Sequence, residues 1–299
     1  MTPLPTPDPS DPGGRRADTA FVPFACVAIV GVGLMGGSLG LAMRERGLAR
    51  HVIGIGRGKE ALDHGVKIGA IDVGTTDMSR GVRDADLVVL AVPVRTIPSL
   101  LETIVPFVRA DALVTDLGST KATIVEAGTH CFGARFVGSH PMAGSEQNGI
   151  EAARTDLYAG AAWAVVRAEP FTLDNDPFAA RIAALASALG ARPVLLQADN
   201  HDRLVALVSH LPHVLSYTFA RSVAMDPGAK QAREIAAGSY RDMMRVSHSD
   251  PRLWSDIFLD NRDALLAVLA AFESEIDALK QAIETGDSNA LVARLSPPQ

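Results

Sequence analysis

Three glycines in one short segment have the spacing of a loop that binds the phosphates of a dinucleotide. Gly31, Gly33 and Gly36 directly follow the apolar run 26–30 and precede a predicted helix over 36–46. In this pattern the first glycine permits a tight turn, the second lets the backbone approach a pyrophosphate, and the third permits close contact between helix and strand. The helix N-terminus would then face the pyrophosphate. The residues expected at this cofactor are Gly31, Gly33, Leu34, Met35 and Gly36.

The residues after the second predicted strand bear on which dinucleotide is bound. Enzymes that use NAD commonly place Asp or Glu there, where the carboxylate binds the adenosine ribose hydroxyls. In this chain Gly56 holds that place, and the cations Arg57 and Lys59 follow it. A guanidinium can bind a 2′-phosphate through two hydrogen bonds. The sequence therefore favours NADP over NAD, although exposed cations in a loop can also be merely solvated.

Ser119 and His140 lie in polar segments that each follow a predicted strand. In open α/β sheets, ligands bind beyond the carboxyl ends of the strands, so such segments are candidates for chemistry. Neutral imidazole accepts protons near pH 7, which makes His140 a candidate general base. The alternatives are that His140 is a hydrogen-bonded loop residue and that Ser119 is a helix N-cap.

The elements that would position these residues alternate between strand and helix. Short β-branched runs separated by helical segments are typical of βαβ units and of a parallel sheet that is buried on both faces. The predicted strands are 27–30, 51–55, 87–92, 113–116, 135–138, 162–166 and 193–197. The end of the third of these, with the residue that follows it, adds Val92 and Pro93 to the expected cofactor site.

After residue 197 the pattern becomes helical. The strongest signal begins at Asp250-Pro251, a cap followed by proline at the first helical position, and predicts one helix that runs to about Thr285, before Gly286. Its apolar stripe is unusually long. The stripe consists of Phe258, Leu265, Leu269, Phe272, Ile276, Leu279 and Ile283. A helical domain of about 100 residues can hardly cover such a face alone, so a homodimer is expected, with packing inside one subunit as the alternative.

Composition limits the other classes of function. The net charge of −6 gives no global attraction to nucleic acid or to anionic membranes, so an anionic ligand needs a local basic site. The apolar, uncharged stretch 21–43 is long enough to span a bilayer, but its glycines fit a strand and a buried helix better. The two cysteines, Cys26 and Cys131, have no metal-ligand spacing, and a cytoplasmic protein is expected.

Taken together, these signals predict an α/β Rossmann-type parallel-sheet domain followed by an all-α dimerisation domain. The expected division is a proline-rich disordered tail over 1–24, the dinucleotide-binding domain over 25–197, and a helical substrate and dimerisation domain over 198–295. No metal is expected, since no third ligand accompanies the pair His210 and His213.

Several segments, in order along the chain, resemble motifs of the prephenate and arogenate dehydrogenases, enzymes of tyrosine biosynthesis. The similar segments are 30–37, 115–121, 138–146, 208–213, 239–245 and 250–258. The resemblance covers nearly the whole chain after residue 25. It implies oxidative decarboxylation of prephenate to 4-hydroxyphenylpyruvate and CO2, with arogenate as the alternative substrate. Residues 286–299 are too few for the chorismate mutase or ACT domains of some relatives, so a monofunctional form is expected.

The resemblance also implies roles for individual residues. His140 matches the family's catalytic histidine, and Ser119 matches the serine that would hydrogen-bond the imidazole or the substrate hydroxyl. Arg245 matches the arginine that binds a substrate carboxylate. Further residues expected at the substrate are His210, His213, Ser145, Glu146 and Arg241. Asp202 is a candidate for attracting an arogenate ammonium, or for capping a helix.

Two other classes of function remain open on these residues. A β-hydroxyacid dehydrogenase-like reductase would share the glycine loop, but it would usually need a catalytic lysine in the helical half, where Lys230 and Lys280 have no such context. A non-catalytic module that senses NADP would bind the cofactor without turnover, and it would have no need of His140 or Arg245.

Overall fold

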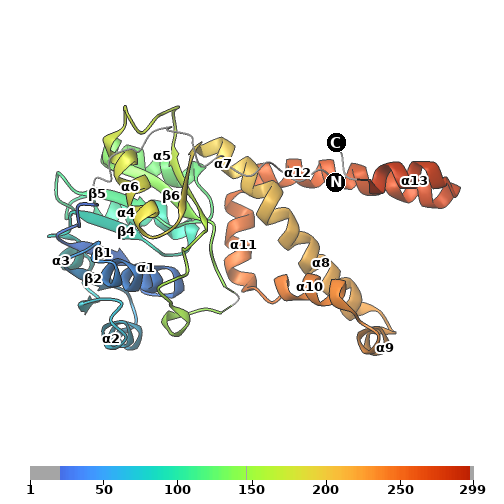
Figure 1. Ribbon diagram of the computed structural model, residues 1–299, viewed down its shortest axis with the longest axis horizontal. Helices are drawn as coiled ribbons and strands as arrows, with labels where there is room; N and C mark the ends of the chain where they lie inside the picture. Colours follow the sequence, from blue (N-terminus) through green and yellow to red (C-terminus); the bar gives the residue numbers. More distant parts are fainter. Residues whose placement is uncertain (1–20, 146, 297–299) are drawn as a thin grey trace, which may run out of the picture.

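The computed structural model describes residues 21–145 and 147–296, which form a sheet domain and a helical domain side by side (Figure 1). The sheet has eight strands in the order β3-β2-β1-β4-β5-β6-β7-β8. The strands are β1 (Val27–Val30), β2 (Val52–Ile55), β3 (Val73–Thr75), β4 (Leu87–Leu90), β5 (Leu113–Asp116), β6 (Phe136–Pro141), β7 (Ala162–Arg167) and β8 (Arg192–Gln197). The predicted Rossmann-type fold is confirmed.

The sheet differs from the prediction in two ways. Strand β7 runs antiparallel to β6, and β8 runs in the same direction as β7. The last two strands therefore point opposite to the strands from β3 to β6, which are all parallel to one another. Strand β3 was not predicted: it has three residues and lies at an edge, and its first residue, Val73, is exposed. Such a short run carries neither the length nor the buried alternation that marks a strand in a sequence.

Helices cover both faces of the sheet because side chains alternate between the faces along each strand. One face packs with α1 (Leu34–Glu45), α2 (Lys59–Lys67) and α6 (Pro177–Ala188). The other packs with α3 (Met78–Val82), α4 (Ile97–Ile104) and α5 (Ala122–Phe132). Within β1, Ile29 belongs to the first cluster and its neighbour Val30 to the second.

The folded domain begins earlier than residue 25, so the expected end of the tail at residue 24 is too late. Phe24 is buried and forms a β-bridge with Ala49. The Arg181 guanidinium lies 4.3 Å from the ring centres of both Phe21 and Phe24, and it donates a hydrogen bond to the Val22 carbonyl. The rest of the expected tail, residues 1–20, lies outside the described residues.

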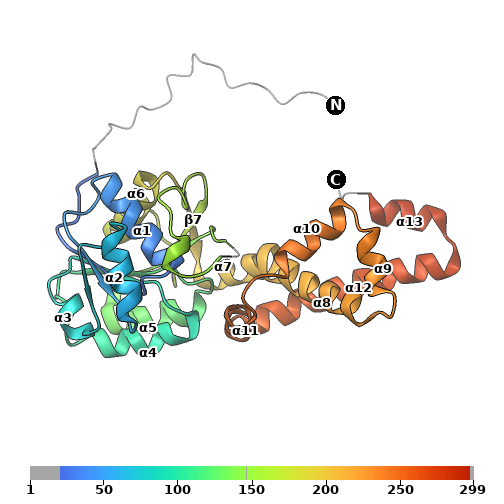
Figure 2. The same ribbon diagram turned by 90° about the horizontal axis from the view of Figure 1, so that it is seen from below.

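After β8 the described chain is helical, as predicted. Helix α7 (Ala198–Val205) continues through a π-helical turn (Ala206–His210) into α8 (Leu211–Met225), which leads away from the sheet domain (Figures 1 and 2). The remaining helices are α9 (Ala229–Glu234), α10 (Gly238–Val246), α11 (Pro251–Asp260), α12 (Arg262–Thr285) and α13 (Ser288–Leu295).

The single helix predicted from residue 250 to about 285 is wrong in one respect: it is broken at Asn261. This residue leaves helical geometry at φ −102° and ψ 35°, and its buried side chain donates hydrogen bonds to the Asp202 carbonyl and to His210 Nδ1. The predicted ends are confirmed. The Asp250 side chain caps α11, and Gly286 ends α12 in the left-handed region at φ +66°. No helix in the described part of the chain is long and apolar enough to cross a membrane.

Candidate active site

The glycine loop has the backbone that a dinucleotide site requires. Gly31 has φ +98°, and a Cβ there would lie 2.2 Å from the Ala91 carbonyl oxygen. At Gly36 a Cβ would lie 2.0 Å from the Gly31 carbonyl oxygen, so both positions exclude a side chain. At Gly33 a Cβ would meet no described atom within 4 Å, which leaves the backbone open to a ligand. Since α1 begins directly after Gly33, the loop and the helix N-terminus fit a pyrophosphate.

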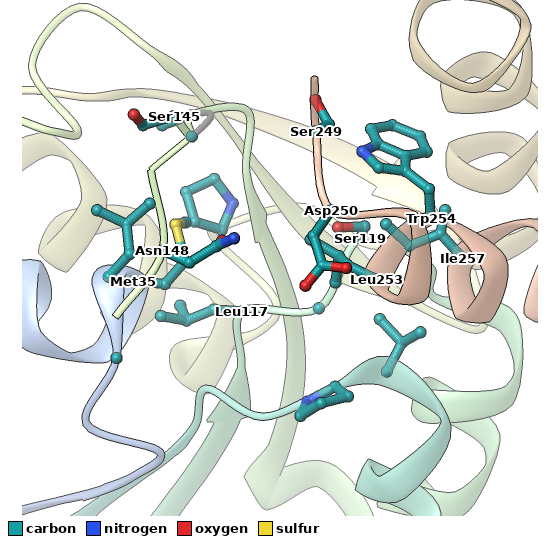
Figure 3. Close-up of a pocket in the computed structure, with 18 of the residues that line it drawn as sticks. Met35, Leu117, Ser119, Ser145, Asn148, Ser249, Asp250, Leu253, Trp254 and Ile257 are labelled. Carbon is teal, nitrogen blue, oxygen red and sulfur yellow. The ribbon is translucent and has the colours of Figure 1, made fainter. Parts of the chain in front are cut away.

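A cavity of about 750 Å³ lies between this loop and the helical domain. Figure 3 shows Met35 and Leu117 of the sheet domain on one side of it, and Asp250 and Trp254 of the helical domain on the other. Ten residues that the sequence assigned to cofactor, catalysis or substrate line this cavity: Gly33, Leu34, Met35, Val92, Pro93, Ser119, His140, Ser145, His213 and Arg245. Residues more than 200 positions apart are thereby brought to one site.

His140 is a buried histidine with one ring nitrogen bound to a second histidine. It lies on β6 rather than in the loop after it, and its Nδ1 is 2.9 Å from Nε2 of His201. His201 Nδ1 is in turn 2.8 Å from Oδ1 of Asp202. Burial, together with the nearby His201, Lys121 and His210 side chains, lowers the pKa of His140 well below its usual 6.5. The imidazole is therefore neutral at pH 7.

The hydrogen bonds define which nitrogen of His140 carries the proton. A carboxylate only accepts, so His201 Nδ1 donates to Asp202, and burial keeps the pKa of His201 below its ordinary value. Neutral His201 then has its lone pair on Nε2. His140 must donate to that lone pair from Nδ1, which leaves the Nε2 lone pair of His140 free to accept a proton.

Ser119 lines the same cavity on the segment between β5 and α5, which a buried ion pair holds in place. Lys121 Nζ and Asp116, both fully buried, form this pair. Asp116 also accepts hydrogen bonds from the Gly118 amide at 2.7 Å and the Ser139 amide at 3.1 Å, so one carboxylate ties the Ser119 segment to the strand of His140. Ser119 does not cap α5, because that helix begins at Ala122.

His213 and Arg245 face the cavity from the helical domain. The His213 ring stacks on Trp254 with ring centres 3.4 Å apart, and its Nδ1 donates to the Ser209 carbonyl at 2.9 Å. Arg245 is exposed on α10. Among the predicted substrate residues, Arg245 brings a positive charge to the cavity lining. Its guanidinium is suited to bind a carboxylate.

Two predicted substrate residues lie elsewhere, and one lies outside the described residues. His210 is only 1% exposed and does not line the cavity, because Asn261 binds its Nδ1 and its ring packs edge-on against Trp254. The expectation of direct substrate contact is therefore wrong for His210. Arg241 is exposed one turn before Arg245 and is not part of the lining. Glu146 belongs to the part of the chain that is not described.

Asp202 is an inter-domain anchor rather than a ligand for an ammonium group. It is buried, and its two carboxylate oxygens accept the amide N–H groups of Lys121 at 2.7 Å and Ala122 at 2.8 Å. These amides open α5, which has no side-chain cap of its own. Asp260 adds hydrogen bonds from the Thr120 and Thr123 hydroxyls to the same helix start. Two carboxylates of the helical domain therefore fix the end of the Ser119 segment.

The position that decides between the two cofactors has the predicted arrangement. Gly56 directly follows β2, and Arg57 after it is exposed and makes no ion pair with any described residue. Lys59, in contrast, pairs with Asp63 at 2.6 Å. Among these cations Arg57 is thus the one available to a ligand. No cluster of three or more His, Cys, Asp or Glu residues suited to a metal occurs in the described chain.

Three residues around the site were not predicted from the sequence: His201, Lys121 and Asn261. His201 and Asn261 act through contacts with residues far away in the sequence, such as the 61 positions that separate His201 from His140, whereas the Lys121 side chain pairs with the nearby Asp116. A local clue existed only for Lys121, which ends a segment already singled out for Ser119.

Fold and site together define a class: the chain is a nicotinamide-dependent dehydrogenase of two domains. Comparison with protein families narrows the class. The family model for "Prephenate dehydrogenase, nucleotide-binding domain" matches residues 39–194, and that for "Prephenate dehydrogenase, dimerization domain" matches residues 197–296. The chain therefore belongs to the prephenate dehydrogenase family, as the resemblance of its motifs implied.

Individual relatives agree with this. The cyclohexadienyl dehydrogenase of Zymomonas mobilis is 33% identical over 92% of this chain and 94% of that protein, and the prephenate dehydrogenase of Bacillus subtilis is 30% identical over 89% and 72%. Among solved structures, Aquifex aeolicus prephenate dehydrogenase in complex with hydroxyphenyl propionate and NAD+ matches with a TM-score of 0.83 and 30% identity, covering 92% of this chain and 96% of that one. Synechocystis arogenate dehydrogenase matches with 0.76 and 28%, covering 90% and 96%.

Proposed function

We propose that the protein catalyses the oxidative decarboxylation of prephenate to 4-hydroxyphenylpyruvate and CO2. The observation that carries the proposal is His140, a neutral base whose Nε2 lone pair is free in the cavity that also contains the glycine loop and Arg245. Family membership supplies the reaction class. The names of relatives include both prephenate and arogenate dehydrogenases, so arogenate is the alternative substrate, with tyrosine as its product.

Different residues of the cavity would bind the cofactor and transfer the proton in this reaction. Gly31 to Gly36, with Val92 and Pro93, would hold the dinucleotide, which supplies a hydride acceptor for C4 of the substrate. His140 accepts the proton of the C4 hydroxyl as the hydride departs. The carboxylate on the ring then leaves as CO2, and its bonding electrons aromatise the ring. The resulting phenolate oxygen takes the proton back from His140, which restores the neutral base.

Arg245 and His213 would orient the substrate. Prephenate carries two carboxylates, and the Arg245 guanidinium in the cavity can bind one of them. His213, stacked on Trp254, forms an adjoining wall. Ser119 and Ser145 offer hydroxyls in the same cavity. Among these groups Ser119, on the segment anchored by Asp116, is suited to hydrogen-bond the reacting hydroxyl.

The test is an assay of the purified protein with prephenate and with arogenate, each with NAD and with NADP. We expect turnover of prephenate, a fall in kcat of about 100-fold or more in His140→Asn because the general base is removed, and little change in cofactor affinity. Arg245→Ala should raise KM for prephenate and leave cofactor affinity intact. Absence of turnover by the unaltered protein in all four combinations would refute the enzymatic proposal. Turnover of arogenate but not of prephenate would show that arogenate, the alternative substrate, is the true one.

We further propose that NADP is the preferred cofactor. Gly56 replaces the carboxylate that would bind ribose hydroxyls and repel a 2′-phosphate, and the exposed Arg57 adjoins it with no ion-pair partner in the described chain. The A. aeolicus relative was solved with NAD+, so cofactor preference has to be measured on this protein.

We also propose that the protein is a homodimer formed through its helical domain. The family model for this half describes a dimerization domain. The apolar stripe of α12 supports the proposal: its early member Leu265 is buried within the subunit, whereas Ile276 and Ile283 are 45% and 62% exposed. An apolar face that continues beyond its own subunit is typical of an interface between copies.

Finally, we propose that the protein is cytoplasmic. Both cysteines of the chain, Cys26 and Cys131, are free, as is usual in a reducing compartment. The reaction proposed above reduces a nicotinamide cofactor, which is in keeping with that compartment.

A further inference from the structure

His201 and Asp202 form a buried chain of hydrogen bonds that begins at His140 and ends at the start of α5. His201 is fully buried, and its two ring nitrogens contact His140 Nδ1 at 2.9 Å and Asp202 Oδ1 at 2.8 Å. Neither His201 nor Asp202 lines the cavity, so neither can touch a substrate there. Their effect on the reaction must therefore pass through His140.

We propose that His201 and Asp202 are positioning residues for His140: they hold its proton on Nδ1 and direct its Nε2 lone pair at the substrate, and the Asp202 carboxylate supplies the negative charge of the hydrogen-bonded chain. The inference rests on the proposed function, in which His140 is the base. In this arrangement residues of the helical domain fix the tautomer and orientation of a base that belongs to the sheet domain.

The order of donors and acceptors in this chain is fixed. Asp202 Oδ1 also accepts the Lys121 amide, and Oδ2 accepts the Ala122 amide, so the carboxylate is immobilised and can only accept. His201 is thereby compelled to donate from Nδ1 and to accept at Nε2. A reversed His140, with its proton on Nε2, would place two lone pairs against each other across 2.9 Å.

The surroundings of His140 disfavour a positive charge on its ring. Burial removes the solvent that would otherwise stabilise such a charge, and His201, Lys121 and His210 all oppose it. Within the hydrogen-bonded chain His140–His201–Asp202, Asp202 is the group that carries a negative charge. When the substrate hydroxyl gives its proton to Nε2, the Nδ1–H of His140 stays bound to His201, and no second proton needs to move. The proton later returns to the phenolate oxygen.

His201 and Asp202 are also built into the joint between the two domains. Asp202 caps α5, and the Asn261 side chain binds the Asp202 carbonyl at 2.8 Å. The position of the His140 ring thus depends on three elements: β6, α7 and the break between α11 and α12. A histidine that only filled space would need neither the carboxylate nor this anchorage.

The experiment compares His201→Leu with His201→Gln. Leucine removes the acceptor for the His140 Nδ1–H, whereas the glutamine Oε1 can replace it. We expect kcat for prephenate to fall about 100-fold or more in His201→Leu, with KM for prephenate and for cofactor changed less than about threefold, and glutamine to restore at least about tenfold of the loss. The control is Asn200→Leu, the exposed neighbour on α7, which should match the unaltered enzyme.

A second measurement does not need turnover. In protein labelled with ¹⁵N at histidine, the ring nitrogens of His140, assigned with His140→Asn, should show a proton on Nδ1 and none on Nε2, and His201→Leu should mix the two tautomers. A proton on Nε2 in the unaltered protein, a kcat within about threefold of normal in His201→Leu, or no gain from glutamine would each overturn the proposal. If the unaltered protein did not act on prephenate, the proposed reaction would fail while the tautomer of His140 could still be read.

Discussion

At the scale of the residue, His140 is a base whose surroundings resist its protonation. Burial and the neighbouring Lys121, His201 and His210 side chains all lower its pKa. A lower pKa keeps the imidazole in its proton-accepting form at pH values where a solvated histidine would already be charged. The structure thus combines a free Nε2 lone pair with a protonation state that makes it available.

This arrangement predicts the pH dependence of the reaction. Because the folded-state pKa of His140 lies below 6.5, kcat/KM for prephenate should stay level as pH falls through 6.5, and it should decline only at more acidic pH, where His140 becomes protonated. The measurement is a pH profile of kcat/KM at saturating cofactor, with Ser119→Ala as the comparison, which should be slower but keep the same acid limb. An acid limb at or above pH 6.5 would contradict the prediction.

Cofactor preference also depends on single residues. Arg57→Ala should raise KM for NADP about 10- to 100-fold, because a charge-assisted hydrogen bond to the 2′-phosphate is lost, and it should leave KM for NAD within about threefold. Lys59→Ala is the matched control, since Lys59 already pairs with Asp63. The converse variant is Gly56→Asp. A Cβ there would lie 3.5 Å from the Leu62 side chain, which is ordinary contact, and the new carboxylate should favour NAD. Equal effects of Arg57→Ala on both cofactors would contradict the assignment.

At the scale of the element, local patterns in the sequence account for the parts of the structure that were predicted. The strands β1 and β5, the glycine loop and the ends at Asp250 and Gly286 follow from apolar runs, glycine spacing and caps, which are properties of neighbouring residues. The break at Asn261 does not, because residues 250–285 have helical periodicity throughout. Asn261 leaves the helix to bind Asp202 and His210, which are more than 50 positions away.

The same contrast holds for the site. Ser119, His140 and Arg245 were found because each lies in a segment with its own recognisable pattern. His201 was missed, and Asp202 was considered only as an ammonium ligand or a helix cap, because their contacts with His140 and α5 exist only once the two domains meet. The antiparallel direction of β7 was not predicted for a related reason. Strand direction depends on the path of the chain between the strands, and the residues of the strand itself do not indicate it.

Asn261 therefore offers a test of the helix break. Asn261→Leu removes the donors to the Asp202 carbonyl and to His210 Nδ1, two buried acceptors, so the free energy of unfolding should fall by about 2 to 4 kcal/mol. Denaturant unfolding followed by circular dichroism measures this. Asn289→Leu, at an exposed position of α13, is the control and should change stability by less than about 0.5 kcal/mol. Equal losses in the two variants would show that the side-chain contacts of Asn261 contribute little.

At the scale of the whole molecule, the two domains meet at the site and the helical domain extends away from it. The start of α5 receives carboxylates from both Asp202 and Asp260, and Arg95 of the sheet domain lies 3.6 Å from Asp256 of α11. Beyond this joint, α12 and α13 reach well past the sheet domain (Figure 1). There α12 and α13 pack against each other, and the apolar side chains of Ile276, Ile283, Val292 and Leu295 stay exposed among the described residues.

The proposed dimer makes this arrangement testable. On α12, Leu265, Ile276 and Ile283 lie on one side of the helix, and only the first of them is buried within the subunit. The double variant Ile276→Glu and Ile283→Glu places two charges in the exposed part of the stripe, and burying them against a second copy would be unfavourable. Light scattering after size-exclusion chromatography should show a dimer for the unaltered protein and a monomer for the double variant.

The control for this experiment lies on the same helix. Ser274 is exposed and lies on the opposite side of α12 from Ile276, since two residues advance the helix by about 200°. Ser274→Glu adds a charge of the same sign and should leave the dimer intact. A monomer at micromolar concentration for the unaltered protein would contradict the proposed interface. A dimer that survived both glutamates would place the interface on another face of the helical domain, and the exposed Ile276 and Ile283 would then need a different explanation.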